Sequence, residues 1–283
     1  MTRRATVAEL LLGIEGLALL RGVITGSDEH ASARVADISR IVGSGDDASL
    51  SGSTAFPERS VEQGYADWSK TYDRPDNPLI HLEETALLPL LESVPPGRAL
   101  DAACGTGRVS GYLADAGHEV LGVDVTPEML ELARAKVPQA RFVVGRLEAL
   151  PVDDARFDLV VCCLALDHCT DVGPPIAELA RAARPGGRVI LTDIHPCMIH
   201  LGGQAAYVDE DGSWAFVRGH PHLHGDYLRA FAASGLAVDE LLEPPPNQVW
   251  FEMQKLAWSH APDAFRQAYE GIPAAMVWSL TRR

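Results

Sequence analysis

The apolar and polar positions of the chain repeat with two periods, which alternate from about residue 98 onward. Segments with an apolar residue every three or four positions predict amphipathic helices. Between them lie seven nearly continuous apolar runs, each about as long as a buried strand, at 98–103, 118–124, 140–145, 157–164, 188–194, 236–242 and 274–280. Buried strands that alternate with helices indicate a parallel sheet covered on both faces. We therefore predict an α/β fold with a Rossmann-like, doubly wound, mostly parallel seven-stranded sheet.

Capping residues mark some of the intervening helices. Thr126-Pro127 supplies an N-cap and a first-turn proline for a helix that runs to about residue 137. A helix near 175–184 is expected to end before Pro185-Gly186-Gly187, because proline and glycine interrupt helices.

The residues before this alternation divide into helices and a linker. Leu10, Ile14 and Leu17 form an apolar stripe at helical spacing, and a second amphipathic helix is predicted over 28–42. The polar segment GSGDDASLSGST, 43–54, predicts a flexible linker. We divide the chain into a helical hairpin with its linker (1–54), a helical cap (55–97) and a core (98–283).

The N-terminal hairpin has two interpretations, a lid or a dimer-forming arm. An amphipathic extension on a flexible linker favours exchange between subunits. We therefore expect a homo-oligomer, a dimer or higher, that uses the N-terminal helices.

Residues 195–224 interrupt the alternation after the fifth strand. The stretch AAYVDEDGSWAFV holds two short apolar runs around Asp211-Gly212, a dipeptide that favours a hairpin turn. We expect this insertion to form a lid that binds the acceptor molecule.

Charge and cysteine content exclude several classes of partner. The net charge is −15 and no Lys/Arg cluster supplies a basic face, so nucleic acid is not expected to bind. Glu9 and Glu15 interrupt the N-terminal apolar stretch, which argues against a secretion signal or a membrane span. The five cysteines are odd in number and lack paired metal spacing. Reduced thiols in a cytoplasmic protein are the expectation.

The glycine loop LDAACGTGR, 100–108, follows the first strand of the core. A dinucleotide fingerprint needs G-x-G-x-x-G, but after Gly105 and Gly107 the next glycine, Gly111, comes one residue late. Asp101 would also repel a pyrophosphate, whereas it would attract a cationic ligand. Asp124, at the tip of the second strand, can accept hydrogen bonds from ribose hydroxyls. The loop therefore predicts an adenosine-bearing cation without phosphate.

Four ordered motifs identify a family resemblance. ALDAACGTGR, VLGVDVTPEMLELARAK, GRLEALPVDDARFDLVVCCLALDH and ARAARPGGRVILTDI, within about 98–242, resemble a class I S-adenosylmethionine-dependent methyltransferase. The small-molecule group, typified by ubiquinone-biosynthesis-like and natural-product enzymes, is the most similar type. The resemblance implies S-adenosylmethionine as methyl donor, S-adenosylhomocysteine as product, and a small-molecule acceptor.

The resemblance assigns roles to residues around the donor. Asp101, Gly105 and Gly107 match the loop under the methionine moiety, Asp124 matches the ribose ligand, and Arg146 stands where the family usually has an aspartate that bonds adenine. Arginine offers no acceptor, so that bond must be missing or replaced. The full predicted donor set is Tyr72, Asp101, Ala103, Gly105, Gly107, Asp124, Val125, Met129, Arg146, Leu147 and Leu164.

The acceptor site is predicted from histidines and aromatic residues outside the strands. His168 and His195 follow the fourth and fifth strands and are the candidate bases. The predicted acceptor-binding set is Tyr65, Trp68, His168, His195, Trp214, His222, His224 and Trp250. His220, His222 and His224 alternate, which raises a metal site as an alternative. Because no cysteine or carboxylate stands at motif spacing, we expect no metal.

Several functions remain open on the sequence. We expect methyl transfer to an oxygen, with nitrogen close behind, on an intermediate of antibiotic or other specialised metabolism. C-methylation of a natural-product intermediate and a non-catalytic S-adenosylmethionine-binding module are the alternatives. An NAD-dependent oxidoreductase is disfavoured, because neither the third glycine nor a Tyr/Lys catalytic pair is found.

Overall fold

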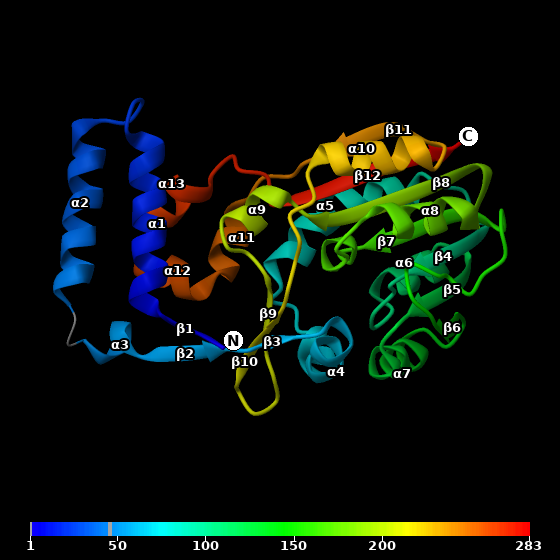
Figure 1. Cartoon of the computed structure of the whole chain (residues 1–283), viewed down its shortest axis with the longest axis horizontal. Coiled ribbons are helices and arrows are strands. Elements are labelled where there is room, and N and C mark those ends of the chain that lie inside the picture. The colour runs from blue at the N-terminus through cyan, green and yellow to red at the C-terminus, as the bar shows by residue number, and fades with distance from the viewer. Residues whose placement is uncertain (1, 45–46) are drawn as a thin grey trace.

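A computed structural model describes residues 2–44 and 47–283, and a seven-stranded sheet forms one end of the elongated molecule (Figure 1). Its strands lie in the order β11-β12-β8-β7-β4-β5-β6. Only β12 runs antiparallel to its neighbours, which confirms the predicted doubly wound, mostly parallel sheet. The strands are β4 (Arg98–Ala102), β5 (Glu119–Asp124), β6 (Arg141–Val144), β7 (Phe157–Cys163), β8 (Ala183–Ile194), β11 (Leu236–Leu242) and β12 (Ala275–Arg282).

Helices cover both faces of this sheet. Ile176 and Phe231, from α8 and α10, pack with Leu100 and Val189 on one face. On the other face, α5 and α6 contribute a second apolar cluster against the same strands. The flanking helices are α5 (Pro78–Glu92), α6 (Arg108–Asp115), α7 (Pro127–Lys136), α8 (Gly173–Ala182) and α10 (His224–Ala233).

The segment Pro185-Gly186-Gly187 belongs to a strand, whereas the sequence predicted only that it follows a helix and precedes the strand at 188–194. Strand β8 already begins at Ala183 and includes these residues. Its register against β7 shifts there, because Phe157 pairs with Ala183 while Leu159 pairs with Arg188. Gly186 supplies the positive φ of +74° that this irregular strand start requires.

The first two helices form the predicted hairpin, α1 (Val7–Gly22) and α2 (Asp28–Gly43), at the end of the molecule away from the sheet (Figure 1). Glu15 and Arg34 form an ion pair of 3.2 Å buried between these helices. The predicted linker segment is more structured than its polar sequence indicates: it contains α3 (Ala48–Ser51) and the start of β2 (Ser53–Phe56). β2 pairs antiparallel with β1 (Arg3–Thr6), a long-range contact that local periodicity does not reveal.

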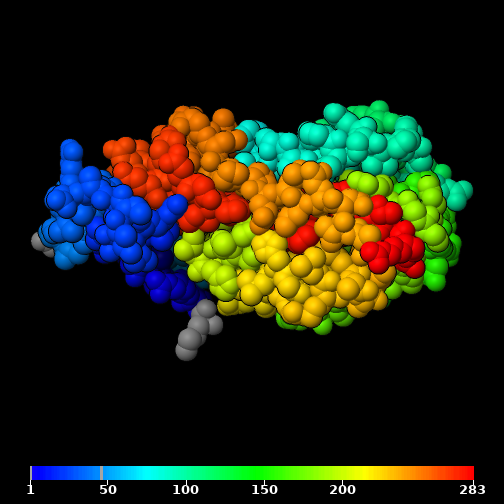
Figure 2. Space-filling model, turned by 90° about the horizontal axis from the view of Figure 1, so that it is seen from above, coloured from blue at the N-terminus to red at the C-terminus, as the bar shows by residue number. Residues whose placement is uncertain are grey.

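A second apolar core joins the two ends of the chain. Leu11 and Ile14 of α1 pack with Trp250, Phe251 and Phe265 from the C-terminal helices. Figure 2 shows these helices beside the N-terminal hairpin. They are α11 (Gln248–Met253), α12 (Lys255–His260) and α13 (Pro262–Tyr269). None of the helices within 2–44 and 47–283 combines the length and the apolar character that crossing a membrane requires.

The cap helix α4 (Val61–Tyr72) and the insertion pack on each other as one cover. The insertion forms the expected hairpin, β9 (Ala205–Val208) and β10 (Trp214–Val217), and β10 also pairs with β3 (Glu58–Arg59). The rings of Trp68 and Tyr207 stack with their centroids 5.2 Å apart. Two segments about 140 residues apart in sequence therefore share one small core. Figure 1 shows α4 and the β9–β10 hairpin at the lower middle of the molecule, between the N-terminal hairpin and the sheet.

Candidate functional site

The glycine loop turns sharply between β4 and α6. Ala103, Gly105 and Gly107 all have positive φ angles, of +58°, +51° and +79°. A Cβ on Gly105 would have no heavy atom within 4 Å, whereas one on Gly107 would lie 3.1 Å from Ala133. Gly107 is therefore needed for close packing against α7, and Gly105 leaves open space above the loop backbone.

Asp101 lies buried at the carboxyl end of β4, directly beneath this loop. The hydroxyl of Ser110 donates to its carboxyl group at 2.6 Å. Burial raises the pKa of Asp101 to about 7, although the hydrogen bond from Ser110 opposes the shift. A cationic ligand group beside Asp101 would favour the ionised carboxylate.

Asp124 ties the tip of β5 to the glycine loop. One carboxylate oxygen accepts the amide N–H of Gly105 and the other accepts that of Thr126, each at 2.8 Å. Burial raises the pKa of Asp124, and these amide hydrogen bonds oppose the shift. Each carboxylate oxygen retains a second lone pair, so Asp124 can also accept the hydroxyl groups of a sugar.

The remaining predicted donor residues differ in their exposure. Met129 is fully buried, while Val125 and Leu147 are half-buried beside the tip of β5 and after β6. Leu164, directly after β7, has a positive φ of +53°. A left-handed leucine is strained, and such residues concentrate at functional sites. Ala103 and Leu164, both left-handed, directly follow the neighbouring strands β4 and β7.

The cap helix is tied to the glycine loop by polar contacts. Asp73, at the end of α4, accepts hydrogen bonds from the Thr106 hydroxyl and the Lys136 ammonium group, each at 2.7 Å. Its neighbour Tyr72 is half-buried, and desolvation raises the pKa of this phenol to about 12, so it stays neutral. The cap therefore lies over the predicted donor site.

Arg146, the departure from the family pattern, reaches the same cap. Its exposed guanidinium pairs with Glu62 of α4 at 2.5 Å and lies 3.7 Å from Glu148. The side chain thus bridges the core and the cap across the surface. The sequence placed Arg146 among the predicted donor residues and gave no indication of this bridge to Glu62.

His168 lies in the 3-10 turn η1 (Leu166–His168), directly after β7. Its Nδ1 is 3.0 Å from the carbonyl oxygen of Arg218, so Nδ1 carries a proton and donates it. Its Nε2 lies 2.7 Å from the hydroxyl of Tyr65, and in this tautomer Nε2 accepts that hydrogen bond. The predicted residues His168 and Tyr65 are therefore brought into direct contact.

Two buried carboxyl groups, Asp167 and Asp193, lie on the same side and are absent from the predicted site residues; an oxygen of Asp167 is 3.8 Å from Nε2 of His168. The Tyr227 hydroxyl donates to Asp193 at 2.6 Å. Burial and the neighbouring Asp167 raise the pKa of Asp193 well above its usual range. Asp167 lies shortly after the end of β7, and Asp193 lies near the end of β8. These positions at strand ends were the only sequence signal for the two residues.

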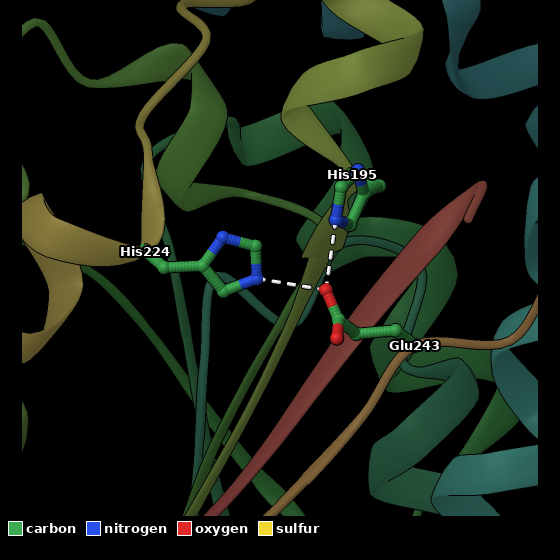
Figure 3. Close-up of side chains that lie close together, drawn as sticks. All are labelled: His195, His224 and Glu243. Atoms are coloured by element: carbon green, nitrogen blue, oxygen red, sulfur yellow. Dashed lines mark hydrogen bonds and ion pairs between the residues drawn. The ribbon is translucent and has the colours of Figure 1, made fainter. Parts of the chain in front are cut away.

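His195 and His224 converge on Glu243, a residue that sequence reasoning missed (Figure 3). One oxygen of Glu243 lies 3.0 Å from Nε2 of His195 and 2.8 Å from Nε2 of His224. His195 begins the short helix α9 (Pro196–His200), and its Nδ1 accepts the amide N–H of Cys197 at 3.2 Å. The three alternating histidines therefore separate, because only His224 joins this cluster.

The other predicted acceptor residues lie apart from this cluster. Nε2 of His222 donates to the carbonyl oxygen of Cys169 at 2.7 Å. Trp214 is exposed on the insertion and packs against Phe56. Trp250 is placed in the second apolar core, where its ring stacks on Phe265. Trp250 therefore serves packing between the chain ends, and the structure does not bring it to the acceptor side.

Comparisons with known proteins agree with this geometry. Residues 100–191 match a family model described as a methyltransferase domain. A malonyl-[acyl-carrier protein] O-methyltransferase from Pseudescherichia vulneris is 36% identical over 137 residues, 48% of this chain and 54% of that protein. The chain spans about half the length of the curated relatives it matches.

Solved structures share the fold at lower identity. An S-adenosylmethionine-dependent methyltransferase from Mesorhizobium loti has a TM-score of 0.55 and 23% identity, with 72% of this chain and 100% of that chain covered. A geranyl diphosphate methyltransferase in complex with GPP and sinefungin also has a TM-score of 0.55, at 17% identity over 72% of this chain and 79% of that chain. The likeness to both establishes the architecture.

Proposed function

We propose, from the premise that residues 100–191 form a class I methyltransferase domain, that this chain moves a methyl group from S-adenosylmethionine to an oxygen of a small-molecule acceptor. The observation that carries the proposal is the pair of buried carboxylates, Asp101 and Asp124, at the tips of the adjacent strands β4 and β5. The open glycine loop lies between them.

The residues present fit this methyl donor. Asp101 supplies a negative charge where the donor has an ammonium group, and the same charge disfavours a pyrophosphate. Asp124 has lone pairs left for two ribose hydroxyls. The bare Cα of Gly105 leaves room for the ligand against the loop. Val125, beside Asp124, offers an apolar surface for adenine.

When bound, S-adenosylmethionine supplies an electrophilic methyl carbon that an acceptor atom attacks in line. The chain's own contribution is to hold the acceptor in line, exclude water and accept a proton. The cap helix and the insertion provide the enclosure, because Asp73 and Glu62 link α4 to both sides of the donor site.

His168 is the better placed of the two candidate bases. Its Nδ1 donates to the carbonyl oxygen of Arg218, which leaves the Nε2 lone pair as the only acceptor. An acceptor hydroxyl could take the place of the Tyr65 hydroxyl at Nε2 and lose its proton to His168 directly. Alternatively, the acceptor could pass its proton to His168 through the Tyr65 hydroxyl. Nδ1 of His195 instead accepts the amide N–H of Cys197 and its Nε2 carries the proton toward Glu243, so the lone pair of His195 is not available to an acceptor hydroxyl.

The cover over the site supports an acceptor that has an aromatic or apolar part. Tyr65, Trp68 and Tyr72 form one aromatic group on α4, with ring centroids 5.0–6.0 Å apart. Such rings suit a flat or apolar acceptor from specialised metabolism. Relatives named as O-methyltransferases support an oxygen acceptor, and transfer to nitrogen or to carbon is the alternative outcome.

Calorimetric titration with S-adenosylhomocysteine and, separately, with NAD tests the donor assignment. We expect S-adenosylhomocysteine to bind and Asp124→Ala to weaken binding at least about tenfold, through loss of charge-assisted hydrogen bonds. The matched control is Glu131→Ala, which deletes an exposed carboxylate on α7. This variant should bind S-adenosylhomocysteine as tightly as the natural chain. Binding of NAD without S-adenosylhomocysteine would overturn the assignment, and binding without turnover on any acceptor would favour a non-catalytic module.

A further inference from the structure

His195, His224 and Glu243 come together from three separate elements at the carboxyl edge of the sheet. His195 follows β8, His224 opens α10, and Glu243 follows β11. Figure 3 shows both imidazole rings pointing at the same carboxylate oxygen. One ligand atom from each residue lies within 4.8 Å of the other two. We propose that these three residues form a binding site for one divalent transition-metal ion such as Zn²⁺.

The spacing of the three groups suits a metal ion. Zinc bonds to nitrogen or oxygen are about 2.0–2.2 Å long, so adjacent ligand atoms around one ion lie roughly 3 Å apart. The carboxylate oxygen of Glu243 lies 3.0 Å and 2.8 Å from the two Nε2 atoms. The side chains need only small adjustments to admit an ion between them.

The donor set selects the type of ion. Two imidazoles and one carboxylate suit Zn²⁺ or Fe²⁺, whereas Mg²⁺ and Ca²⁺ prefer oxygen ligands alone. Three protein ligands also leave at least one coordination position for water or an oxygen of a bound molecule. The site is therefore of the open kind rather than a closed structural one.

The surroundings hold the ligands in place and leave an opening. His195 is 4% exposed, and its backbone N–H donates to the carbonyl oxygen of Ala274 at 3.0 Å. The ring of His224 packs edge-on against Trp278. The side chains of His224 and Glu243 are each 36% exposed, so an ion has a route from solvent.

Charge also favours a cation here. In the part of the chain that the structure describes, both ion-pair partners of Glu243 are histidines, and neither lysine nor arginine pairs with it. A carboxylate held between two imidazoles without a permanent cation leaves its negative charge for an incoming ion.

A hydrogen-bonded trio without metal is the competing interpretation. Nδ1 of His195 accepts the amide N–H of Cys197, so its proton is on Nε2 when no ion is bound. Coordination through Nε2 moves this proton to Nδ1 and breaks the hydrogen bond to Cys197. At 3.2 Å this bond lies at the long end of the normal range, so its loss, with the Nδ1 proton then facing the N–H of Cys197, opposes metal binding by about the worth of one hydrogen bond.

The test is metal titration of the full-length chain after treatment with a chelator. We expect one equivalent of Zn²⁺ or Co²⁺ to bind, with no binding of Mg²⁺ at the same concentration, and Zn²⁺ to raise the melting temperature. Co²⁺ should also produce the visible absorption of a nitrogen- and oxygen-ligated ion. These readouts are independent of methyl transfer, so failure of the proposed function would leave them unchanged.

Variants assign the ion to these residues. His224→Ala and Glu243→Gln should each weaken Zn²⁺ binding at least about tenfold, as losses in metal sites generally do. His200→Ala removes an exposed histidine from the nearby helix α9 and is the matched control. Three outcomes would each overturn the proposal in favour of the hydrogen-bonded trio. The folded chain could fail to bind Zn²⁺ or Co²⁺, it could bind Mg²⁺ equally well, or His200→Ala could weaken Zn²⁺ binding as much as the ligand variants do.

Discussion

Arg108, at the start of α6, donates a hydrogen bond of 2.6 Å to Glu83 of α5, whose side chain is completely buried. The hydroxyl of Thr192, on β8, donates to the same carboxylate. The second guanidinium arm of Arg108 bonds Glu84 at 3.0 Å. The residue that ends the glycine loop is thereby anchored to a helix beneath it and, through Glu83, to the centre of the sheet.

Removal of this anchor should destabilise the fold. Arg108→Met leaves the buried Glu83 without its cationic partner, so we expect the free energy of unfolding to fall by about 3–5 kcal/mol. Urea denaturation measures the change. The double variant Glu83→Gln with Arg108→Met should recover most of the loss, because it removes both charges. A single-variant loss below about 1 kcal/mol would contradict a buried ion pair.

Asp101 should make stability depend on pH. Its folded pKa of about 7 lies above the ordinary value of 3.8, so its stabilising contribution is present at about pH 4 and is lost as pH rises through 7. The contribution is on the order of 4 kcal/mol across that window. Urea denaturation at pH 5 and pH 8 should show about 3 kcal/mol of this fall for the natural chain, since only the part above pH 5 is sampled, and a smaller fall for Asp101→Asn. Equal pH dependence in both proteins would show that Asp101 does not titrate there.

His168 should set the rate of the proposed reaction on a hydroxyl acceptor. His168→Gln is expected to lower kcat about 10²-fold or more, because a positioned base contributes that much. Tyr65→Phe keeps the base and should lower kcat less. Steady-state rates and their pH profiles measure both effects. If Tyr65→Phe abolishes the rate while His168→Gln preserves it, the roles of the two residues are reversed.

The Arg146–Glu62 bridge should govern release of the donor product more than stability. Both side chains are more than half exposed, so Arg146→Gln should cost less than about 1 kcal/mol of folding free energy. Because the bridge ties the cap to the core, the variant should release S-adenosylhomocysteine several-fold faster, as stopped-flow measurements would show. Arg156→Gln, at a surface ion pair far from the cap, should leave release unchanged.

The predicted homo-oligomer can be tested at the tip of the N-terminal hairpin. Leu20, Val23 and Ile24 are exposed there, and Ile24 is 92% exposed. We expect Ile24→Glu to shift the chain toward monomer in light scattering coupled to size exclusion. Thr25→Glu places the charge at the adjacent position as a control. A natural chain that is already monomeric would remove the expectation.

The sequence was most informative where the proposed donor site depends on local spacing. Motif spacing and strand periodicity picked out the predicted donor residues because these lie within one loop and the end of the next strand. They are Asp101, Gly105, Gly107 and Asp124. Each of the seven strands was also predicted, because a strand buried on both faces is a continuous apolar run. These features depend on a few consecutive residues.

The features that the sequence did not indicate depend on distant pairs. Glu83 meets Arg108 across 25 positions, and Glu243 meets His195 across 48. Neither glutamate stands in a motif, and each gains its role only when the sheet brings two elements together. The prediction that Trp250 binds the acceptor was wrong for a different reason. An aromatic residue in the tail has the same sequence signature whether it lines a pocket or packs in a core.

The shared core of the chain ends bears on how the protein is made. Leu11, Ile14 and Ala18 of α1 are buried partly by α13, which comes much later in the sequence. During synthesis from the N-terminus, the hairpin emerges from the ribosome long before its partner exists. The part of the apolar face of α1 that packs on α13 therefore stays uncovered until α13 has been synthesised, and it is available to chaperones until then.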